Sequence, residues 1–194
     1  DNLGKIDEHG KRADSIVQSM LLHSRDGPGE QRTIAINDLA SEALNLAYHG
    51  ARAEVQGFNV TLEKNLDDAA GMIDDIPQDL TRVFLNVIGN GLDATHQRDE
   101  MGESGYQPTL SLSTRDLGDR VEIVIRDNGT GMPEEVADKI FDPFFTTKPP
   151  GKGTGLGLSI SHDIVVKQHG GQFDVDSQDG EYTAFRIVLP RSGS

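Results

Sequence analysis

Two asparagines four residues apart, Asn86 and Asn90, form a pair whose type and spacing could do chemistry. On a helix they would share one face, because residues four apart lie one turn above each other. An amide oxygen is a hard ligand of the kind that Mg²⁺ accepts while it bridges substrate phosphates. The pair is therefore a candidate metal site. For an isolated pair, two capping or core amides are a reasonable alternative.

A second candidate is a run of alternating glycines directly before a predicted helix at residues 156–169, namely Gly151, Gly153, Gly155 and Gly157. Glycine permits positive φ and exposes backbone N–H groups, and a helix N-terminus adds partial positive charge, so this segment could bind phosphates. It lacks the Gly-x₄-Gly-Lys-[Ser/Thr] spacing of a Walker loop. It also differs in context from a dinucleotide fingerprint, because a long loop rather than a strand precedes it.

A third candidate, the segment Asp-Asn-Gly-Thr-Gly-Met at residues 127–132, follows a predicted strand. A plain turn explains Asp-Asn-Gly. That interpretation leaves Gly131 without a reason. Two glycines would instead let the backbone pass close to a ligand.

These candidates need elements to position them. Alternating apolar residues predict strands at 58–63, 109–114, 120–126, 172–177 and 183–189. Helical periodicity predicts helices at 39–53, 76–97 and 156–169. Asn37 or Asp38 is a plausible cap for the first helix, and a short turn joins 109–114 to 120–126 as a hairpin. The mixture predicts a two-layer α/β (α+β) sandwich, with a mixed sheet of about five strands covered on one face by three helices.

The N-terminal residues carry a different pattern. Apolar or small residues recur in steps of three and four, at Leu3, Ile6, Gly10, Ala13, Val17 and Met20. This spacing is typical of a coiled-coil or bundle seam, although a helix packed on its own domain is the simpler alternative. A polar break at 24–29 then separates it from the rest, so we expect a helical segment at 1–27 and a second domain at 34–190.

Composition excludes several classes of function. The 194 residues hold 18 Lys and Arg against 32 Asp and Glu, so a net charge of −14 argues against binding to nucleic-acid backbones. With no Cys, disulfides and thiolate chemistry are excluded. No apolar stretch approaches the ~20 residues that span a bilayer, so we expect no membrane contact by this fragment. The chain begins without Met and in mid-pattern, which favours a fragment of a longer protein.

Four motifs in fixed order now carry a resemblance: residues 86–90, 127–132, the Phe-Asp-Pro-Phe-Phe-Thr-Thr-Lys segment at 141–148, and the glycine run at 151–159. The chain closely resembles the catalytic, ATP-binding domain of sensor histidine kinases, a superfamily that also includes gyrase and mismatch-repair ATPases. The resemblance covers residues 34–190. It implies that residues 132–154 form an ATP lid, anchored by Phe141, Phe144 and Phe145.

The resemblance also implies roles for single residues. Asn90 would coordinate Mg²⁺, and the Asp127 carboxylate would accept a hydrogen bond from the adenine amine. Asn86 occupies the position where gyrase-type relatives carry a water-activating Glu, and an amide cannot serve as that base. The implied catalytic residues are Asn86, Asn90 and Lys148. The implied ATP-binding residues are Asn90, Asp93, Asp127, Gly129, Gly131, Met132, Phe144, Lys148, Lys152, Gly153, Thr154, Gly155, Leu156, Gly157, Leu158 and Thr183.

Three details qualify this set. Lys148 and Lys152 could reach phosphates, with a solvated-loop role as the rival for each. Gly91 stands where the family usually has Ala, which should weaken the helix by ~1 kcal/mol. Tyr182 replaces the commoner Gly beside Thr183.

The implied activity is transfer of the ATP γ-phosphoryl group to a His on an upstream dimerisation helix, and from there to an Asp of a response-regulator receiver domain. None of the six His has the expected acceptor context, so we expect residues 1–27 to be the second helix of that hairpin. His9 as the acceptor is the alternative to a solvent-facing helical His. The full protein is expected to form a homodimer through the hairpin. A cytoplasmic location is expected, either alone or as part of a larger or membrane-anchored sensor.

Two other functions stay open. A degenerate pseudokinase could use ATP only to set its conformation. An ATP hydrolase of the gyrase type would need a Glu at position 86 and a larger transducer domain.

Overall fold

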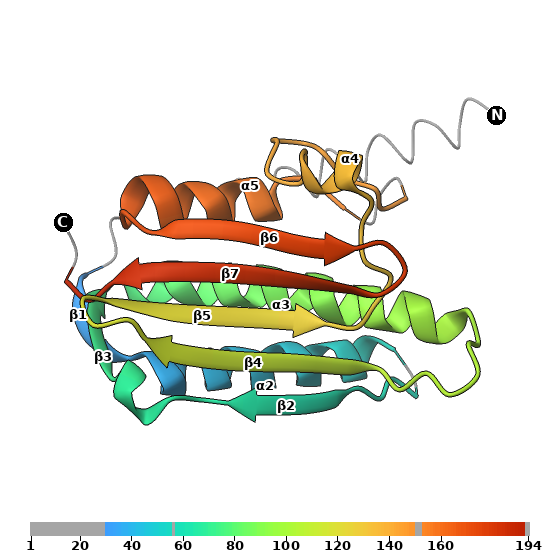
Figure 1. The fold of residues 1–194 in the computed structure, drawn as a ribbon, viewed down its shortest axis with the longest axis horizontal. Helices are drawn as coiled ribbons and strands as arrows, with labels where there is room; N and C mark the ends of the chain where they lie inside the picture. The colour runs from blue at the N-terminus through green and yellow to red at the C-terminus, as the bar shows by residue number, and fades with distance from the viewer. Residues whose placement is uncertain (1–29, 56, 150–152, 193–194) are drawn as a thin grey trace.

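A five-stranded mixed sheet forms one layer of the protein (Figure 1), as the sequence predicts. The computed structural model describes residues 30–55, 57–149 and 153–192. The strand order is β2-β4-β5-β7-β6, in which β2 runs parallel to β4 and all other pairs are antiparallel. The strands are β2 (Thr61–Asn65), β4 (Thr109–Asp116), β5 (Arg120–Asp127), β6 (Gln172–Gln178) and β7 (Tyr182–Pro190).

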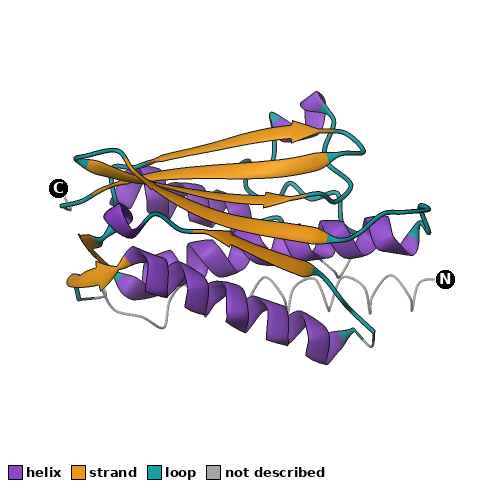
Figure 2. Ribbon diagram, turned by 60° about the horizontal axis from the view of Figure 1, so that its bottom comes forward, coloured by secondary structure: helices purple, strands orange, loops and turns teal. Residues whose placement is uncertain are grey.

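Helices cover one face of this sheet, as Figure 2 shows from the side. They are α2 (Ile36–Glu54), α3 (Pro77–Glu100) and α5 (Gly157–His162), which continues as the π-helical η2 (Asp163–Gln168). The central helix α3 starts at Pro77, as predicted, because proline suits the first helical position. Its buried side chains recur in steps of three and four and form much of the core: Leu80, Val83, Phe84, Val87, Ile88 and Leu92.

A second sheet of two strands was not predicted. It pairs β1 (Arg32–Ala35) with β3 (Met72–Asp75) in antiparallel register. The Arg191 guanidinium connects this region to the C-terminal end of β7, since it donates hydrogen bonds to the carbonyl oxygens of Ala70 (2.8 Å) and Met72 (3.1 Å). Because these contacts join distant parts of the chain, no local sequence pattern predicts them. The short elements η1 (Asp68–Ala70) and α4 (Glu134–Ala137) complete the fold.

Two sequence-based boundaries were wrong. The strand predicted at 58–63 begins only at Thr61, because Phe58 and Val60 are buried in the preceding loop. Helix α2 begins at Ile36, and Ala35, which offers no side-chain cap, precedes it. Asn37 lies inside the helix instead, where its amide donates to the Asp67 carbonyl (2.9 Å) and accepts from the Thr114 hydroxyl (2.7 Å).

The helical segment expected at residues 1–27 lies outside the described residues. Among the helices of the described ranges, none combines the length and the apolar composition that crossing a membrane requires.

Candidate functional site

A cavity of about 420 Å³ opens between α3, the turn after β5, strand β7 and the loop that leads into α5. The predicted site residues that line it are Asn86, Asn90, Asp93, Asp127, Gly131, Met132, Lys148, Gly153, Thr154, Gly155, Gly157, Leu158 and Thr183. Four motifs that are far apart in the sequence therefore meet at one place. Gly129, Phe144 and Leu156 are not part of its lining, and Lys152 lies outside the described residues.

Helix α3 supplies one wall of the cavity. Asn86, Asn90, Asp93 and Gln97 follow one another in steps of four, three and four, which places them along one helical face. Ala94 lies on the same face and also lines the cavity. The sequence reasoning missed Ala94 and Gln97. Ala94 continues the four-residue spacing of the two asparagines, whereas Gln97 lies four residues after Asp93 on the same face.

Asn86 connects this wall to α5. Its amide nitrogen lies 3.3 Å from the Gly157 carbonyl oxygen and 3.1 Å from the Ser161 hydroxyl, and it donates to both. These contacts use the donor side of the amide and hold the start of α5 against α3. A neutral amide in this role orients the site and provides no base for activating water.

A cation already lies at the Asn90 amide. The Lys148 ammonium is 3.2 Å from the Asn90 Oδ1 atom and 2.5 Å from an Asp93 carboxylate oxygen. Within the described ranges, no group of three or more His, Cys, Asp or Glu side chains could hold a metal ion by itself. The Asn90 amide oxygen and the Asp93 carboxylate are oxygen donors of the hard kind that Mg²⁺ accepts beside water and phosphate ligands.

The cavity is also lined by a buried carboxylate. Asp127, the last residue of β5, is only 4% exposed and accepts a hydrogen bond from the Gly129 backbone N–H (2.9 Å). Burial raises the pKa of Asp127 to about 6, although hydrogen bonds from backbone N–H groups act in the opposite direction. A buried acceptor with a perturbed pKa in a cavity is typical of a ligand-binding site.

Gly91 has a packing role beside Asp127. A Cβ atom there would lie 2.9 Å from a methyl carbon of Leu110 and 3.3 Å from the Asp127 Oδ2 atom. The absence of a side chain thus lets α3 pack closely against β4 and β5. The expected helix weakening therefore accompanies a closer contact at the carboxylate.

Two glycines in the turn after β5 permit close backbone approach. Gly131 has a φ of +61°, and a Cβ atom there would lie 1.9 Å from the Gln178 carbonyl oxygen. At Gly129 a Cβ atom would lie 2.5 Å from the Ala94 carbonyl carbon. Any larger residue would displace backbone at either position, so both glycines are required by the surrounding structure.

Thr183 faces Asp127 across the β5–β7 pair, because the two residues are partners in the strand register. Its hydroxyl lies 3.0 Å from that of Ser177, which also accepts from the Met132 backbone N–H (2.9 Å). The neighbouring Tyr182 does not line the cavity, since its hydroxyl donates to an Asp176 carboxylate oxygen (2.9 Å).

The three phenylalanines of residues 141–148 differ in burial. The Phe141 ring packs on those of His162 (4.9 Å) and Phe173 (5.0 Å), and Phe145 packs against the core. Phe144 is 50% exposed and is not among the side chains packed against the core, although its backbone N–H donates to the Gly155 carbonyl (2.8 Å). Besides Ala94 and Gln97, the sequence analysis did not select six further lining residues: Thr130, Val136, Ile140, Thr146, Thr147 and Phe185.

Known proteins are similar to this chain in both sequence and fold. The family described as histidine kinase-, DNA gyrase B-, and HSP90-like ATPase matches residues 75–193. Sporulation kinase C of Bacillus subtilis (strain 168) is 32% identical over 181 residues, which cover 93% of this chain and 39% of that protein. Sensor kinase CckA of Brucella abortus (strain 2308) is 36% identical over 200 residues, which cover 96% of this chain and 20% of that protein.

Among solved structures, the catalytic domain of histidine kinase ThkA in a nucleotide-free form has a TM-score of 0.69 and 26% identity. The match covers 84% of this chain and 97% of that domain. By contrast, the chain spans well under half the length of the two curated relatives.

Proposed function

Since the chain belongs to the family of histidine kinase-, DNA gyrase B- and HSP90-like ATPases, we propose that it is the catalytic part of a sensor histidine kinase and binds Mg-ATP in the cavity. The observation that carries the proposal is one cavity lined both by a buried acceptor, Asp127, and by a cation-binding amide, Asn90. A nucleotide has the matching chemistry, with a donor amine on its base and an anionic phosphate chain.

The base would bind at the Asp127 end. As a carboxylate, Asp127 accepts hydrogen bonds and therefore favours the exocyclic amine of adenine over the carbonyl oxygen of guanine. Thr183 faces it from the paired strand and offers a hydroxyl to the same ring, directly or through water. Gly131, which also lines the cavity, packs directly against the Gln178 carbonyl oxygen and leaves no room for a side chain there.

The phosphates would bind at the Asn90 end. The Asn90 Oδ1 atom would hold Mg²⁺, which when bound neutralises part of the phosphate charge. The Lys148 ammonium lies within reach of the same place and would bind phosphate oxygens, and Gly153 and Gly155 would bring backbone N–H groups close to them. Local positive groups of this kind are needed, because the chain carries a net charge of −14.

The proposed reaction transfers the γ-phosphoryl group to a histidine on a dimerisation helix. A bond forms between an imidazole nitrogen and phosphorus, the bond from phosphorus to the ADP oxygen breaks, and ADP leaves. Catalysis of this kind depends mainly on positioning and charge neutralisation. The phosphoryl group would then pass to an Asp of a receiver domain. We place the kinase in the cytoplasm, as a homodimer through its helical hairpin, alone or within a larger sensor.

The alternatives have less support. A hydrolase would need a base where Asn86 holds α5 by its amide. The relatives are named as kinases, which supports catalysis over a degenerate scaffold.

Calorimetry with Mg-ATP tests the proposal. We expect the unchanged chain to bind, Asn90→Ala to lose at least about tenfold in affinity through the missing oxygen ligand, and the matched control Asn45→Ala, an exposed helical asparagine of α2, to bind normally. Equal affinities for Asn90→Ala and the unchanged chain would contradict the site. For the reaction, full-length protein incubated with radiolabelled ATP should acquire acid-labile label on a histidine; binding without labelling would favour the scaffold instead.

A further inference from the structure

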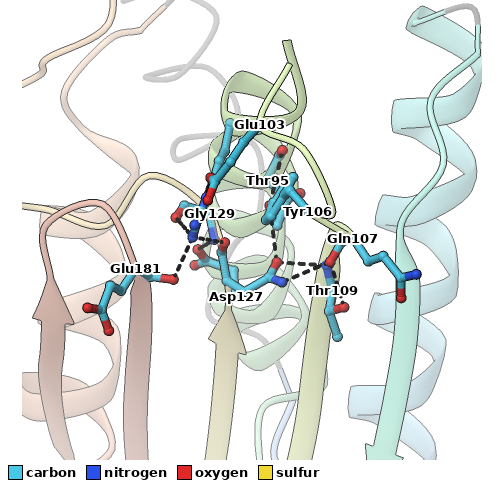
Figure 3. A network of polar contacts seen from close by, with 10 residues as sticks. Thr95, Glu103, Tyr106, Gln107, Thr109, Asp127, Gly129 and Glu181 are labelled. Atoms are coloured by element: carbon cyan, nitrogen blue, oxygen red, sulfur yellow. Dashed lines mark hydrogen bonds and ion pairs between the residues drawn. The ribbon is translucent and has the colours of Figure 1, made fainter. Parts of the chain in front are cut away.

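We infer that Arg98, which does not line the cavity, is a positioning residue that sets how selectively the adenine end of the cavity recognises its base. The inference rests on the proposed function, because it concerns the same nucleotide. It starts from a network of polar contacts behind Asp127 that the proposed chemistry does not use (Figure 3).

Arg98 joins the two strand ends that carry the proposed base contacts. Its Nη1 atom donates to the carbonyl oxygens of Asn128 (3.0 Å) and Gly129 (3.4 Å), directly after Asp127. The same atom donates to the carbonyl oxygen of Glu181 (3.2 Å), two residues before Thr183. One guanidinium therefore spans β5 and β7 at the edge where Asp127 and Thr183 are paired.

The guanidinium itself is held in a single orientation. Its Nε atom donates to a Glu103 carboxylate oxygen at 2.9 Å, and its Cζ atom lies over the Tyr106 ring, 4.6 Å from the centroid. The ion pair and the aromatic contact together restrict the orientation of the planar guanidinium and therefore of its N–H donors. The Arg98 side chain is only 18% exposed, so water competes weakly for these bonds.

Tyr106 reinforces the same turn through a separate contact. Its hydroxyl donates to the Asn128 side-chain oxygen at 3.1 Å, and that oxygen also accepts from the Thr109 backbone N–H at 2.8 Å. Hydrogen bonds therefore hold both the main chain and the side chain of Asn128. A residue held on both sides leaves the preceding Asp127 little freedom to shift.

The network lies at one end of α3 and the proposed phosphate end lies elsewhere on that helix. Arg98 follows Asn90 by eight residues, and none of its hydrogen bonds involves Asn90, Asp93 or Lys148. Loss of Arg98 should therefore loosen the base end and leave phosphate binding intact. This asymmetry separates positioning from a general effect on folding.

The test compares Mg-ATP with Mg-ITP, whose base carries a carbonyl oxygen in place of the amine. Arg98→Met keeps the apolar stem and removes the guanidinium. Arg186→Met is the matched control, because the Arg186 guanidinium is also ion-paired, with Glu122 and Asp174, and these residues do not line the cavity. Calorimetry yields the dissociation constant for each nucleotide. Reversible partial unfolding would raise both constants by the same factor and leave the preference for ATP over ITP unchanged.

We expect Arg98→Met to raise the Kd for ATP about tenfold, the order expected for lost charge-assisted hydrogen bonds, and to reduce the preference for ATP over ITP. Arg186→Met should leave both the Kd for ATP and the preference for ATP over ITP unchanged. If Arg98→Met is unfolded at the assay temperature, Tyr106→Phe provides the same test, with an expected rise of about threefold.

An ATP affinity within twofold of the unchanged chain, or an equal loss for both nucleotides, would overturn the inference. Failure of the unchanged chain to bind Mg-ATP would instead refute the proposed function, and this inference with it.

Discussion

Replacing Asp127 by asparagine should make the ligand-free protein more stable while weakening nucleotide binding. The carboxylate is almost completely buried, and burial raises its pKa from the ordinary 3.8 to about 6. At neutral pH the folded protein therefore keeps a charge in a place that disfavours it. An asparagine side chain at this position would have nearly the same shape without that charge.

The magnitude follows from the pKa values. The difference between about 6 and 3.8 corresponds to ~3 kcal/mol of unfolding free energy at neutral pH. Asparagine retains an oxygen that can accept from the Gly129 N–H, but this bond loses its charge-assisted strength, on the order of 1 kcal/mol. We therefore expect Asp127→Asn to gain about 1–3 kcal/mol at pH 7.5.

The sign of the pH dependence is specific. Because the folded-state pKa is the higher one, protonation stabilises the folded protein as the pH falls from about 6 towards 3.8. The advantage of Asp127→Asn should therefore be greatest at pH 7.5 and approach zero near pH 4. Urea unfolding at pH 7.5, 6, 5 and 4 measures it as the difference between the two proteins at each pH.

Glu122, on the same strand, provides a control of opposite sign. It is also buried, but hydrogen bonds from Arg186 and Arg115 outweigh the effect of burial and lower its pKa. Glu122→Gln should therefore destabilise the protein at pH 7.5. Calorimetry should show weaker Mg-ATP binding for Asp127→Asn. A loss of stability in Asp127→Asn at pH 7.5, or a gain that does not vary with pH, would refute the reasoning.

Other predictions concern His169, two glycines and Lys148. Burial lowers the pKa of His169, but its contacts with Asp75 and Asp79 have the larger effect, so the pKa is raised overall. The charged imidazole therefore stabilises the folded protein below pH 6.5, and this stabilisation is lost as the pH rises through the raised pKa. Urea unfolding should thus show His169→Gln to be less stable than the unchanged chain by about 1–3 kcal/mol at pH 6 and by less at pH 9; an equal cost at both would contradict this. Thermal unfolding should show a larger loss of stability for Gly131→Ala than for Gly180→Ala. Both glycines have positive φ, but only a Cβ at Gly131 would meet backbone, at the Gln178 carbonyl. Gly180→Ala should cost about 1 kcal/mol of stability, and equal losses for the two variants would count against the packing argument. Lys148→Met should change the free energy of unfolding by under about 0.5 kcal/mol, because its partner Asp93 is largely exposed. The same substitution should lower Mg-ATP affinity several-fold by calorimetry, and an unchanged affinity would remove Lys148 from the site.

Local patterns in the sequence were sufficient for most elements. Apolar residues in steps of three and four located α3 and its buried face, and alternation located β4, β5, β6 and β7. Both signals report burial through a fixed repeat, so they succeed wherever one element has one buried face. Phe58 and Val60 show where this fails, because they are buried from a loop.

The candidate site was partly visible for the same reason. Asn86 and Asn90 belong to one helical face by spacing alone, and the glycines before α5 mark a segment where backbone can approach a ligand. Continuing that spacing would also have identified Ala94. Motif order associated these segments with one family, but no spacing rule could show that they surround one cavity.

The sequence alone thus determined which residue types could bind a nucleotide and which elements carry them. Tertiary structure decided the rest: the raised pKa of Asp127, the close packing at Gly91, and the reach of Arg98 to a carbonyl 83 residues away. The physical reason is that burial and hydrogen-bond partners arise from chain segments brought together by the fold. Such contacts have no repeat along the sequence, so they can be seen only once the sheet and helices are assembled.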